Sequence, residues 1–243
     1  MNLLKKLFRR TPERTRPYCA ALIAAAGSST RYGGENKLLQ ELGGMPVLAR
    51  TLLAVDRAES IDEIVIAARE DELLTYAQLC KTFDLQKPVK VVIGGATRTE
   101  SVLRAACEAS PDAALLAVQD GARPLVTSAL IDEVVLAAQQ YHAAAPAIPV
   151  TDTVKVAVNG VVESTPERSK LFAVQTPQVF DAELLKAALQ DALRANAALT
   201  DDCSAVERFG KEVHLTEGNA ENIKITRPLD LIVAEAILQS RGE

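Results

Sequence analysis

The chain has 243 residues, with 27 Lys and Arg against 32 Asp and Glu, so its formal net charge is −5. Residues 1–17 contain six basic side chains and one acidic side chain, which leaves 21 basic and 31 acidic side chains in residues 18–243. A protein that binds nucleic acid along a broad surface needs an excess of basic groups. The acidic body therefore excludes nucleic acid as a partner, although it leaves room for one local cationic pocket.

The sequence contains no run of about 20 continuous apolar residues, so we expect no stable membrane insertion. Its four cysteines are scattered, without paired spacing or neighbouring histidines. This usage indicates small core residues in a reducing compartment rather than disulfides or a zinc site, and so a cytoplasmic location. The basic residues 1–17 form an N-terminal extension, which is either loosely ordered or in contact with a surface or partner.

From residue 18 onward, short apolar runs alternate with longer segments of helical spacing. The apolar runs predict buried strands at residues 18–25, 63–67, 89–93 and 113–118. The helical spacing predicts helices at residues 46–58, 71–83, 99–109 and 128–141. Strands that are buried on both faces and joined through helices are typical of parallel sheets. The pattern therefore predicts an α/β fold, a three-layer sandwich with a mostly parallel central sheet.

The pattern changes near residue 150. β-branched residues flank Asn159-Gly160, and Asn-Gly between such runs is a strong hairpin signal. We expect a protruding β-arm over about residues 151–175. Because an isolated hairpin buries little surface, we expect this arm to pack on a second subunit. The remaining sequence predicts strands at residues 212–215 and 222–226 and helices at residues 181–195, 201–209 and 229–239.

The first predicted strand leads into a loop of small and basic residues, AAGSSTRYGGENK at residues 25–37. Open α/β sheets bind ligands beyond the carboxyl ends of their strands, and the N–H groups of small residues there can hold phosphate oxygens. Arg31 and Lys37 add full positive charges. Neither the phosphate-loop motif nor the dinucleotide motif is present, because Gly34 stands where Lys is required and Ser29 where the second glycine is required. An ordinary flexible turn remains the alternative.

Two later loops are expected at the same edge of the sheet. In one, Gly95 permits close approach of a ligand, and Arg98 and Ser101 can reach its polar groups. In the other, Asp120 ends an apolar strand beside Arg123. A carboxylate beside basic residues suits a Mg²⁺ that carries a polyphosphate. Taken alone, a helix-start turn and an Asp-Gly turn are the plain alternatives for these two loops.

Lys224 lies inside the strand predicted at residues 222–226. If Ile223 and Ile225 face the core, Lys224 faces the opposite side. A lysine at such a position usually belongs to a solvated face, so Lys224 is a candidate site residue only in combination with the three loops.

Eight motifs occur in this chain in the order found in one family: AAAGSSTR, NK, GGxxRxxSV, QDGARP, DTVK, QTPQ, TDD and NIKITRP. From about residue 18 to residue 238, the chain resembles the cytidylyltransferases of the isoprenoid pathway. The resemblance implies a Rossmann-like nucleotidyltransferase domain over residues 18–243 and a homodimer built through the arm. It implies a reaction of CTP with 2-C-methyl-D-erythritol 4-phosphate that releases pyrophosphate.

The resemblance also implies roles for individual residues. Positions that hold cytosine and ribose match Ala25, Ala26, Gly27, Gly95 and Ser101. The catalytic cations around the triphosphate match Arg31, Lys37 and Lys224. Other residues expected to contact CTP are Arg98, Gly121 and the metal-binding Asp120. Arm residues that reach the partner subunit's sugar phosphate match Thr153 and Arg168. Further positions near that substrate match Arg123, Thr176 and Thr200. The chain departs from the family's usual pattern at Asn36, where Pro is common, and at Gly121, where Ala is common.

The expected chemistry is in-line attack of a substrate phosphate oxygen on the α-phosphorus of CTP. Both reactants are anionic, so Mg²⁺ and fixed cations must offset their repulsion. The second pKa of a phosphate monoester is about 6, so the nucleophile is already ionised and needs no general base. His142 and His214 accordingly lie outside the motifs. The alternatives are a cytidylyltransferase for another polyol phosphate, such as ribitol 5-phosphate, and a CTP-binding protein without catalysis.

Overall fold

The computed structural model describes residues 16–27, 32 and 36–242. Arg31 and most of the N-terminal extension lie outside these residues. Across the described residues, no helix combines the length and the apolar character needed to cross a bilayer.

The centre of the fold is a mostly parallel sheet of eight strands within the described residues. Its strands are β1 (Tyr18–Ala24), β4 (Glu63–Ala68), β5 (Val89–Ile93), β6 (Ala113–Asp120), β7 (Ala143–Pro149), β10 (Phe172–Val174), β11 (Gln178–Asp181) and β12 (His214–Glu217). They follow the order β10-β7-β11-β6-β1-β4-β5, and β12 pairs with β7. β5, β4, β1 and β6 are parallel neighbours, whereas β11 runs antiparallel to both β6 and β7.

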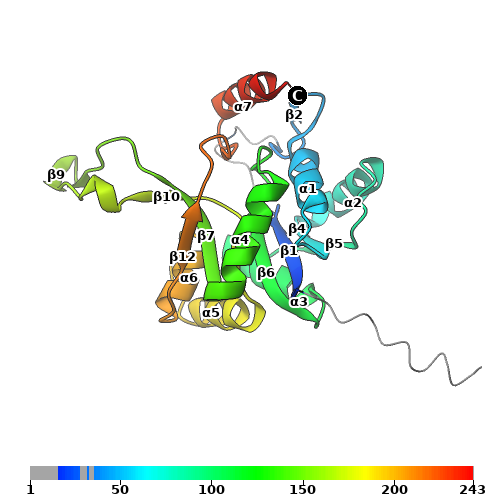
Figure 1. The fold of residues 1–243 in the computed structure, drawn as a ribbon, viewed down its shortest axis with the longest axis horizontal. Helices are drawn as coiled ribbons and strands as arrows, with labels where there is room; N and C mark the ends of the chain where they lie inside the picture. The colour runs from blue at the N-terminus through cyan, green and yellow to red at the C-terminus, as the bar shows by residue number, and fades with distance from the viewer. Residues whose placement is uncertain (1–15, 28–31, 33–35, 243) are drawn as a thin grey trace, which may run out of the picture.

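Helices cover both faces of this sheet, which makes the three layers (Figure 1). They are α1 (Val47–Arg57), α2 (Leu73–Thr82), α3 (Arg98–Glu108), α4 (Ser128–Tyr141), α5 (Ala182–Arg194), α6 (Asp202–Arg208) and α7 (Pro228–Arg241). Successive residues of β1 alternate between two cores. Ala21 and Ile23 pack with α1, α2 and α4, while Ala20 and Leu22 pack with α3, α5 and α6. The sequence of β1 is apolar throughout because both faces of the strand are buried, as expected. The predicted α/β fold class is confirmed.

The strand predicted at residues 222–226 is wrong. Ile225 is fully buried, but its N–H donates to the carbonyl of Ala122 at 2.8 Å rather than to a neighbouring strand. The N–H groups of Asn222 and Ile223 donate to residues only two or three positions earlier. Local turns and the bond to Ala122 therefore take the place of strand pairing, and the buried Ile225 anchors this irregular segment to the loop after β6.

Three strands of the main sheet were not expected from sequence. β7 has the sequence AAAPAIP, which is low in β-branched residues and contains two prolines. β10 and β11 are short. These strands form because they pair with one another in the folded sheet, where β7 lies between β10 and β11. A two-stranded hairpin of β2 (Glu41–Leu42) and β3 (Met45–Pro46) before α1 was also not expected.

The region after β7 contains the expected hairpin, formed by β8 (Val156–Val158) and β9 (Val161–Ser164). Asn159 and Gly160 at its turn have φ angles of 51° and 80°, the left-handed conformation that this turn requires. All residues of both strands are exposed, and Figure 1 shows the hairpin extending away from the main sheet. β10, at the end of the same region, pairs with β7 and so belongs to the main sheet.

Candidate functional site

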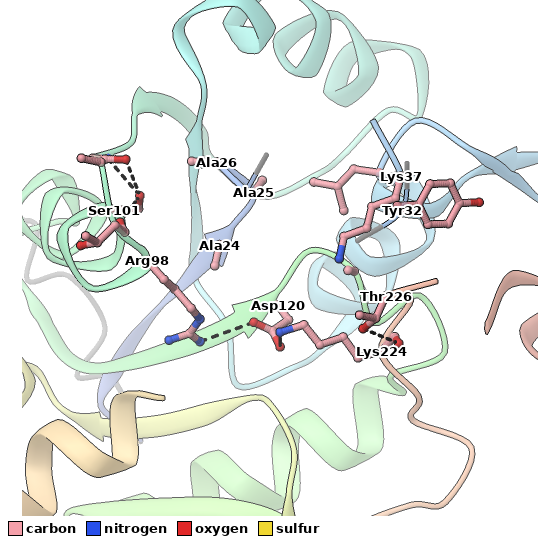
Figure 2. Close-up of a pocket in the computed structure, with 16 residues that line it drawn as sticks. Ala24, Ala25, Ala26, Tyr32, Lys37, Arg98, Ser101, Asp120, Lys224 and Thr226 are labelled. Carbon is pink, nitrogen blue, oxygen red and sulfur yellow. Dashed lines mark hydrogen bonds and ion pairs between the residues drawn. The ribbon is translucent and has the colours of Figure 1, made fainter. Parts of the chain in front are cut away.

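The three loops singled out from sequence meet at one edge of the sheet. They follow β1, β5 and β6, and a backbone hydrogen bond ties the start of each loop to the end of a neighbouring strand. Ala25 N–H donates to Ala67 O of β4 at 3.0 Å and Gly94 N–H to Ala68 O of β4 at 2.8 Å. Gly121 N–H donates to Ala24 O of β1 at 3.1 Å. A cavity of about 360 Å³ opens there (Figure 2). It is lined by Ala24, Ala25, Ala26, Gly27, Tyr32, Lys37, Leu38, Gly95, Ala96, Thr97, Arg98, Ser101, Asp120, Ala122, Lys224 and Thr226.

Gly94 lets the first two loops approach each other. A Cβ at this position would lie 2.6 Å from the Cβ of Ala26, so a larger residue would push the loops apart. The second loop then passes into α3, where the Thr97 side chain accepts a hydrogen bond from Glu100 N–H. Ser101 Oγ accepts from Gly95 N–H at 2.9 Å and donates to Thr97 O at 2.8 Å. These bonds fix the small-residue side of the pocket.

Asp120 is the electrostatic centre of the pocket. Its carboxylate is 2.7 Å from Lys224 Nζ, 3.4 Å from Arg98 Nη2 and 3.6 Å from Arg123 Nε. Burial acts to raise the pKa of Asp120, but the charges of Lys224, Arg98 and Arg123 outweigh it and hold the pKa well below its usual range. Asp120 is therefore ionised throughout the neutral range. Its own N–H donates to Thr176 Oγ1 at 3.1 Å.

Arg98 joins Asp120 to a second buried carboxylate, that of Asp202. Arg98 Nη1 lies 2.8 Å from Asp202 Oδ2, and Asp202 is 1% exposed. Burial raises the pKa of Asp202, while Arg98 partly offsets that rise. Sequence reasoning used the TDD motif that contains Asp202 but assigned this residue no role. The motif was the available signal, because a helix-start aspartate is otherwise indistinguishable from an exposed cap.

Two lysines point into the pocket from segments that lie far apart in sequence (Figure 2). Lys37 Nζ donates to Ile225 O at 2.7 Å. Lys224 pairs with Asp120, and the bond from Ile225 N–H to Ala122 O holds the adjoining backbone beside the third loop. Lys224 therefore faces the pocket as expected, although the segment that carries it is irregular and not a strand.

Most of the residues predicted to contact CTP line this pocket: Ala25, Ala26, Gly27, Lys37, Gly95, Arg98, Ser101, Asp120 and Lys224. Gly121 lies directly beside it, and its carbonyl accepts from Thr51 Oγ1 at 3.0 Å. Arg123 and Thr176 contact Asp120 from outside the lining. The sequence did not single out Tyr32 or Thr226, which also line the cavity.

Three predicted substrate residues lie outside the pocket lining. Thr153 and Arg168 are exposed in the region of the hairpin, where Arg168 Nη1 donates to Thr151 O at 3.1 Å. Thr200 is exposed just before α6. Within one chain, then, the described site has a nucleotide-sized pocket, while the predicted arm residues lie elsewhere.

The residue set fits a divalent cation held through few protein ligands. Among the described residues, no group of three or more His, Cys, Asp or Glu is arranged to hold a metal ion. Asp120 is the one acidic side chain among the residues that line the pocket. Mg²⁺ commonly binds through one or two carboxylates and takes its other ligands from substrate phosphates and water. Asp120 matches that mode if Lys224 yields part of its contact.

The chain matches the family model described as IspD: 2-C-methyl-D-erythritol 4-phosphate cytidylyltransferase over residues 19–240. A protein of that description from Bacillus thuringiensis is 42% identical over 218 residues, which cover 89% of this chain and 96% of that protein. One from Synechococcus sp. is 43% identical over 229 residues, covering 91% and 97%.

Solved structures agree. A 4-diphosphocytidyl-2C-methyl-D-erythritol synthase from Anaerococcus prevotii superposes with a TM-score of 0.83 at 32% identity, covering 92% of this chain and 96% of that chain. A 2-C-methyl-D-erythritol 4-phosphate cytidylyltransferase from Thermus thermophilus superposes with a TM-score of 0.73 at 33% identity, covering 91% and 99%.

The lowered pKa of Asp120 predicts a pH signature in the free energy of unfolding. An unfolded aspartate titrates at about 3.9. Because the folded pKa is lower, the stabilisation from ionised Asp120 is complete above pH ~5 and is lost as the pH falls toward the folded pKa. We would measure the free energy of unfolding in urea for the wild type and for Asp120→Asn. The difference between the two should be constant from pH ~8 to ~5 and should become smaller below pH ~4.

Asp112 is exposed, so Asp112→Asn is the control for this measurement. Its free energy of unfolding should differ little from that of the wild type at any of these pH values. A gap between the wild type and Asp120→Asn that already narrows between pH ~8 and ~5 would contradict the assignment, because it would place the titration of Asp120 too high.

Proposed function

This chain belongs to the 2-C-methyl-D-erythritol 4-phosphate cytidylyltransferase family, and from that premise we propose how its pocket joins CTP to 2-C-methyl-D-erythritol 4-phosphate. The products are 4-diphosphocytidyl-2-C-methyl-D-erythritol and pyrophosphate, a step in non-mevalonate isoprenoid precursor biosynthesis. The observation that carries the proposal is the Asp120 carboxylate, surrounded by cations at the edge of a nucleotide-sized cavity. The free state of all four cysteines supports the expected cytoplasmic location.

CTP occupies the cavity with its nucleoside on the small-residue side. Ala25, Ala26 and Gly27 leave room for the base, and the ordered turn at Gly95 and Ser101 supplies fixed polar groups. The triphosphate lies on the opposite side, toward Lys37 and Lys224. Residue 31, an arginine that matches the family motif, is proposed as a further triphosphate contact on that resemblance.

The reaction exchanges one bond at the α-phosphorus of CTP for another. A phosphate oxygen of the sugar phosphate forms a bond to this phosphorus, and the bond to the oxygen that bridges to the β-phosphate breaks. The electron pair leaves with pyrophosphate. The attacking phosphate is ionised above its second pKa of about 6, so no side chain must remove a proton and no covalent enzyme intermediate forms.

Catalysis by the chain itself is electrostatic. Lys37 and Lys224 approach the pocket from different segments, each oriented by a contact at its ammonium group. Fixed positive charges that face developing negative charge are most effective where water is excluded. Arg98 keeps Asp202 as a counterion even when Asp120 is engaged elsewhere, so its guanidinium stays in place. When bound at Asp120, Mg²⁺ neutralises part of the triphosphate charge.

The second substrate binds beside Asp120, between two chains. Arg123 and Thr176 contact Asp120 but do not line the pocket. Thr200 lies just before α6, close in sequence to Asp202. We assign Thr153 and Arg168 to the partner's site, because both are exposed and lie outside the lining of the pocket in their own chain.

The exposed surface of the hairpin region supports a homodimer. Over residues 154–162 its exposed large hydrophobic residues are Val154, Val156, Val158, Val161 and Val162. A two-stranded hairpin alone is marginally stable in water. A second copy of the chain that covers these valines would stabilise the hairpin and receive Arg168 in its own site.

Pyrophosphate release tests the activity and its specificity together. We expect Mg²⁺-dependent release with CTP and 2-C-methyl-D-erythritol 4-phosphate, and far slower release when ATP, GTP or UTP replaces CTP. Ribitol 5-phosphate is the matched second substrate. Equal or faster turnover of ribitol 5-phosphate would contradict the assigned sugar phosphate, and CTP binding without any turnover would point to a binding protein.

Mixing two inactive variants tests the shared site. Lys224→Ala damages the pocket of its own chain, and Arg168→Ala damages the partner's. After unfolding and refolding together, random pairing gives heterodimers with one intact site, so about a quarter of wild-type activity should return. A mixture of Lys224→Ala and Lys37→Ala is the control and should stay inactive. A Lys224→Ala and Arg168→Ala mixture no more active than its separate components would contradict an arm that reaches the partner.

A further inference from the structure

A cluster of four polar side chains lies behind Lys37, outside the pocket lining. We call Asn36, Arg69, Glu72 and Tyr76 the Asn36 cluster. Asn36 Nδ2 donates to Glu72 Oε1 and, at 3.0 Å, to Tyr76 Oη. Tyr76 Oη donates to Glu72 Oε2 at 2.9 Å, and Arg69 Nη2 lies 2.8 Å from Glu72 Oε1. The activity described above leaves this cluster without a role.

The chemistry of the cluster fixes the orientation of the Asn36 amide. An ionised carboxylate only accepts hydrogen bonds, so the nitrogen of Asn36 must face Glu72. The amide oxygen then faces the other way and accepts from Leu38 N–H at 2.9 Å. One side chain thus links the start of α2 to the backbone on the far side of Lys37.

The partners of Asn36 form a rigid base. Tyr76, a residue of α2, is fully buried in the core, and Glu72 is 6% exposed. Burial raises the pKa of Tyr76, and although the bond from Asn36 opposes that rise, the net shift is upward. The hydroxyl therefore keeps its proton and continues to donate to Glu72. A buried network with these bonds resists displacement of Asn36, because each lost bond would leave a buried polar group unpaired.

Lys37 stands between two anchored residues. Asn36 holds the preceding position through the cluster, and Leu38, 4% exposed, packs into the core on the following side. A lysine side chain has four flexible carbons, so the position of its ammonium group depends on where its Cα is held. Lys37 points into the pocket (Figure 2), and its Nζ donates to Ile225 O at 2.7 Å.

We propose that Asn36 is a positioning residue that holds Lys37 in register with the triphosphate site, through its bonds to Glu72 and Tyr76. The inference rests on the proposed function, since it concerns the same pocket. The role needs the two groups of the Asn36 amide, a donor toward Glu72 and an acceptor for Leu38 N–H. The consequence is that α2 contributes to catalysis without touching the substrate.

A double-mutant cycle of Asn36→Ala and Lys37→Ala tests the proposal. Lys37→Ala should lower kcat by about 10²–10³-fold, the usual loss for one group that stabilises transition-state charge. Asn36→Ala alone should lower kcat by about 10-fold to 100-fold, because small misplacements of a catalytic group are costly, with little change in KM for the sugar phosphate. In the Lys37→Ala background, Asn36→Ala should change kcat less than about twofold, since the group it positions is gone.

Two further variants separate positioning from folding. Tyr76→Phe keeps the buried ring and removes only the hydroxyl, so it should reproduce part of the kcat loss of Asn36→Ala. Asp71→Asn is the matched control: Asp71 pairs with the same Arg69 at 3.3 Å, but on the exposed side and away from Asn36. Asp71→Asn should leave kcat unchanged.

For the wild type, the two single variants and the double variant, we would measure kcat and, by calorimetry, the Kd for CTP. A merely structural role would lower Tm and give the same fold-loss with or without Lys37. That result overturns the proposal, as does Asn36→Ala with wild-type kcat. If the wild type itself releases no pyrophosphate, the proposed function fails separately. The Kd cycle then decides: non-additive losses support the positioning role and additive losses overturn it.

Discussion

The charge of one buried carboxylate organises this site. Asp120 ends β6 at the edge of the sheet, and cations from α3, from the loop after β6 and from the segment before α7 converge on it. Without that negative charge, Lys224, Arg98 and Arg123 would repel one another at close range in a partly dry pocket. Asp120 therefore lets the chain hold several positive charges in place before any phosphate arrives. A polyanionic substrate can then take over the contacts that these cations make with Asp120, and it does not have to bring the cations together itself.

The remainder of the fold supplies the frame for this charge. Parallel strands bring the ends of β1, β5 and β6 to one edge, although their loops are far apart in sequence. Asp202 holds Arg98 from α6, and Ile225 ties the Lys224 segment to the loop after Asp120. The overall acidity of the chain is thus compatible with a polyphosphate site, because a small share of its basic residues is concentrated around one acid.

The sequence predicted those parts of the structure that depend on local pattern. Apolar runs located β1, β4, β5 and β6, and motif order located Asp120 and Lys224, since both kinds of signal lie in contiguous residues. It missed β7, whose Ala-Pro sequence becomes a strand only through its neighbours. It also missed the inward orientation of Asp202 and the cluster behind Lys37, because these depend on which helix packs beside which loop. The strand expected around Lys224 was wrong for the same reason.

A crystal structure of the chain with CTP and Mg²⁺ is the most direct test of this charge arrangement. We expect the cytosine against Ala25–Gly27 and the Gly95 turn, and the triphosphate between the ammonium groups of Lys37 and Lys224. We also expect Lys224 Nζ to move from its 2.7 Å contact with Asp120 toward a phosphate oxygen, while Arg98 stays on Asp202. A triphosphate bound away from both lysines, with Lys224 still paired to Asp120, would contradict the central role given to this carboxylate.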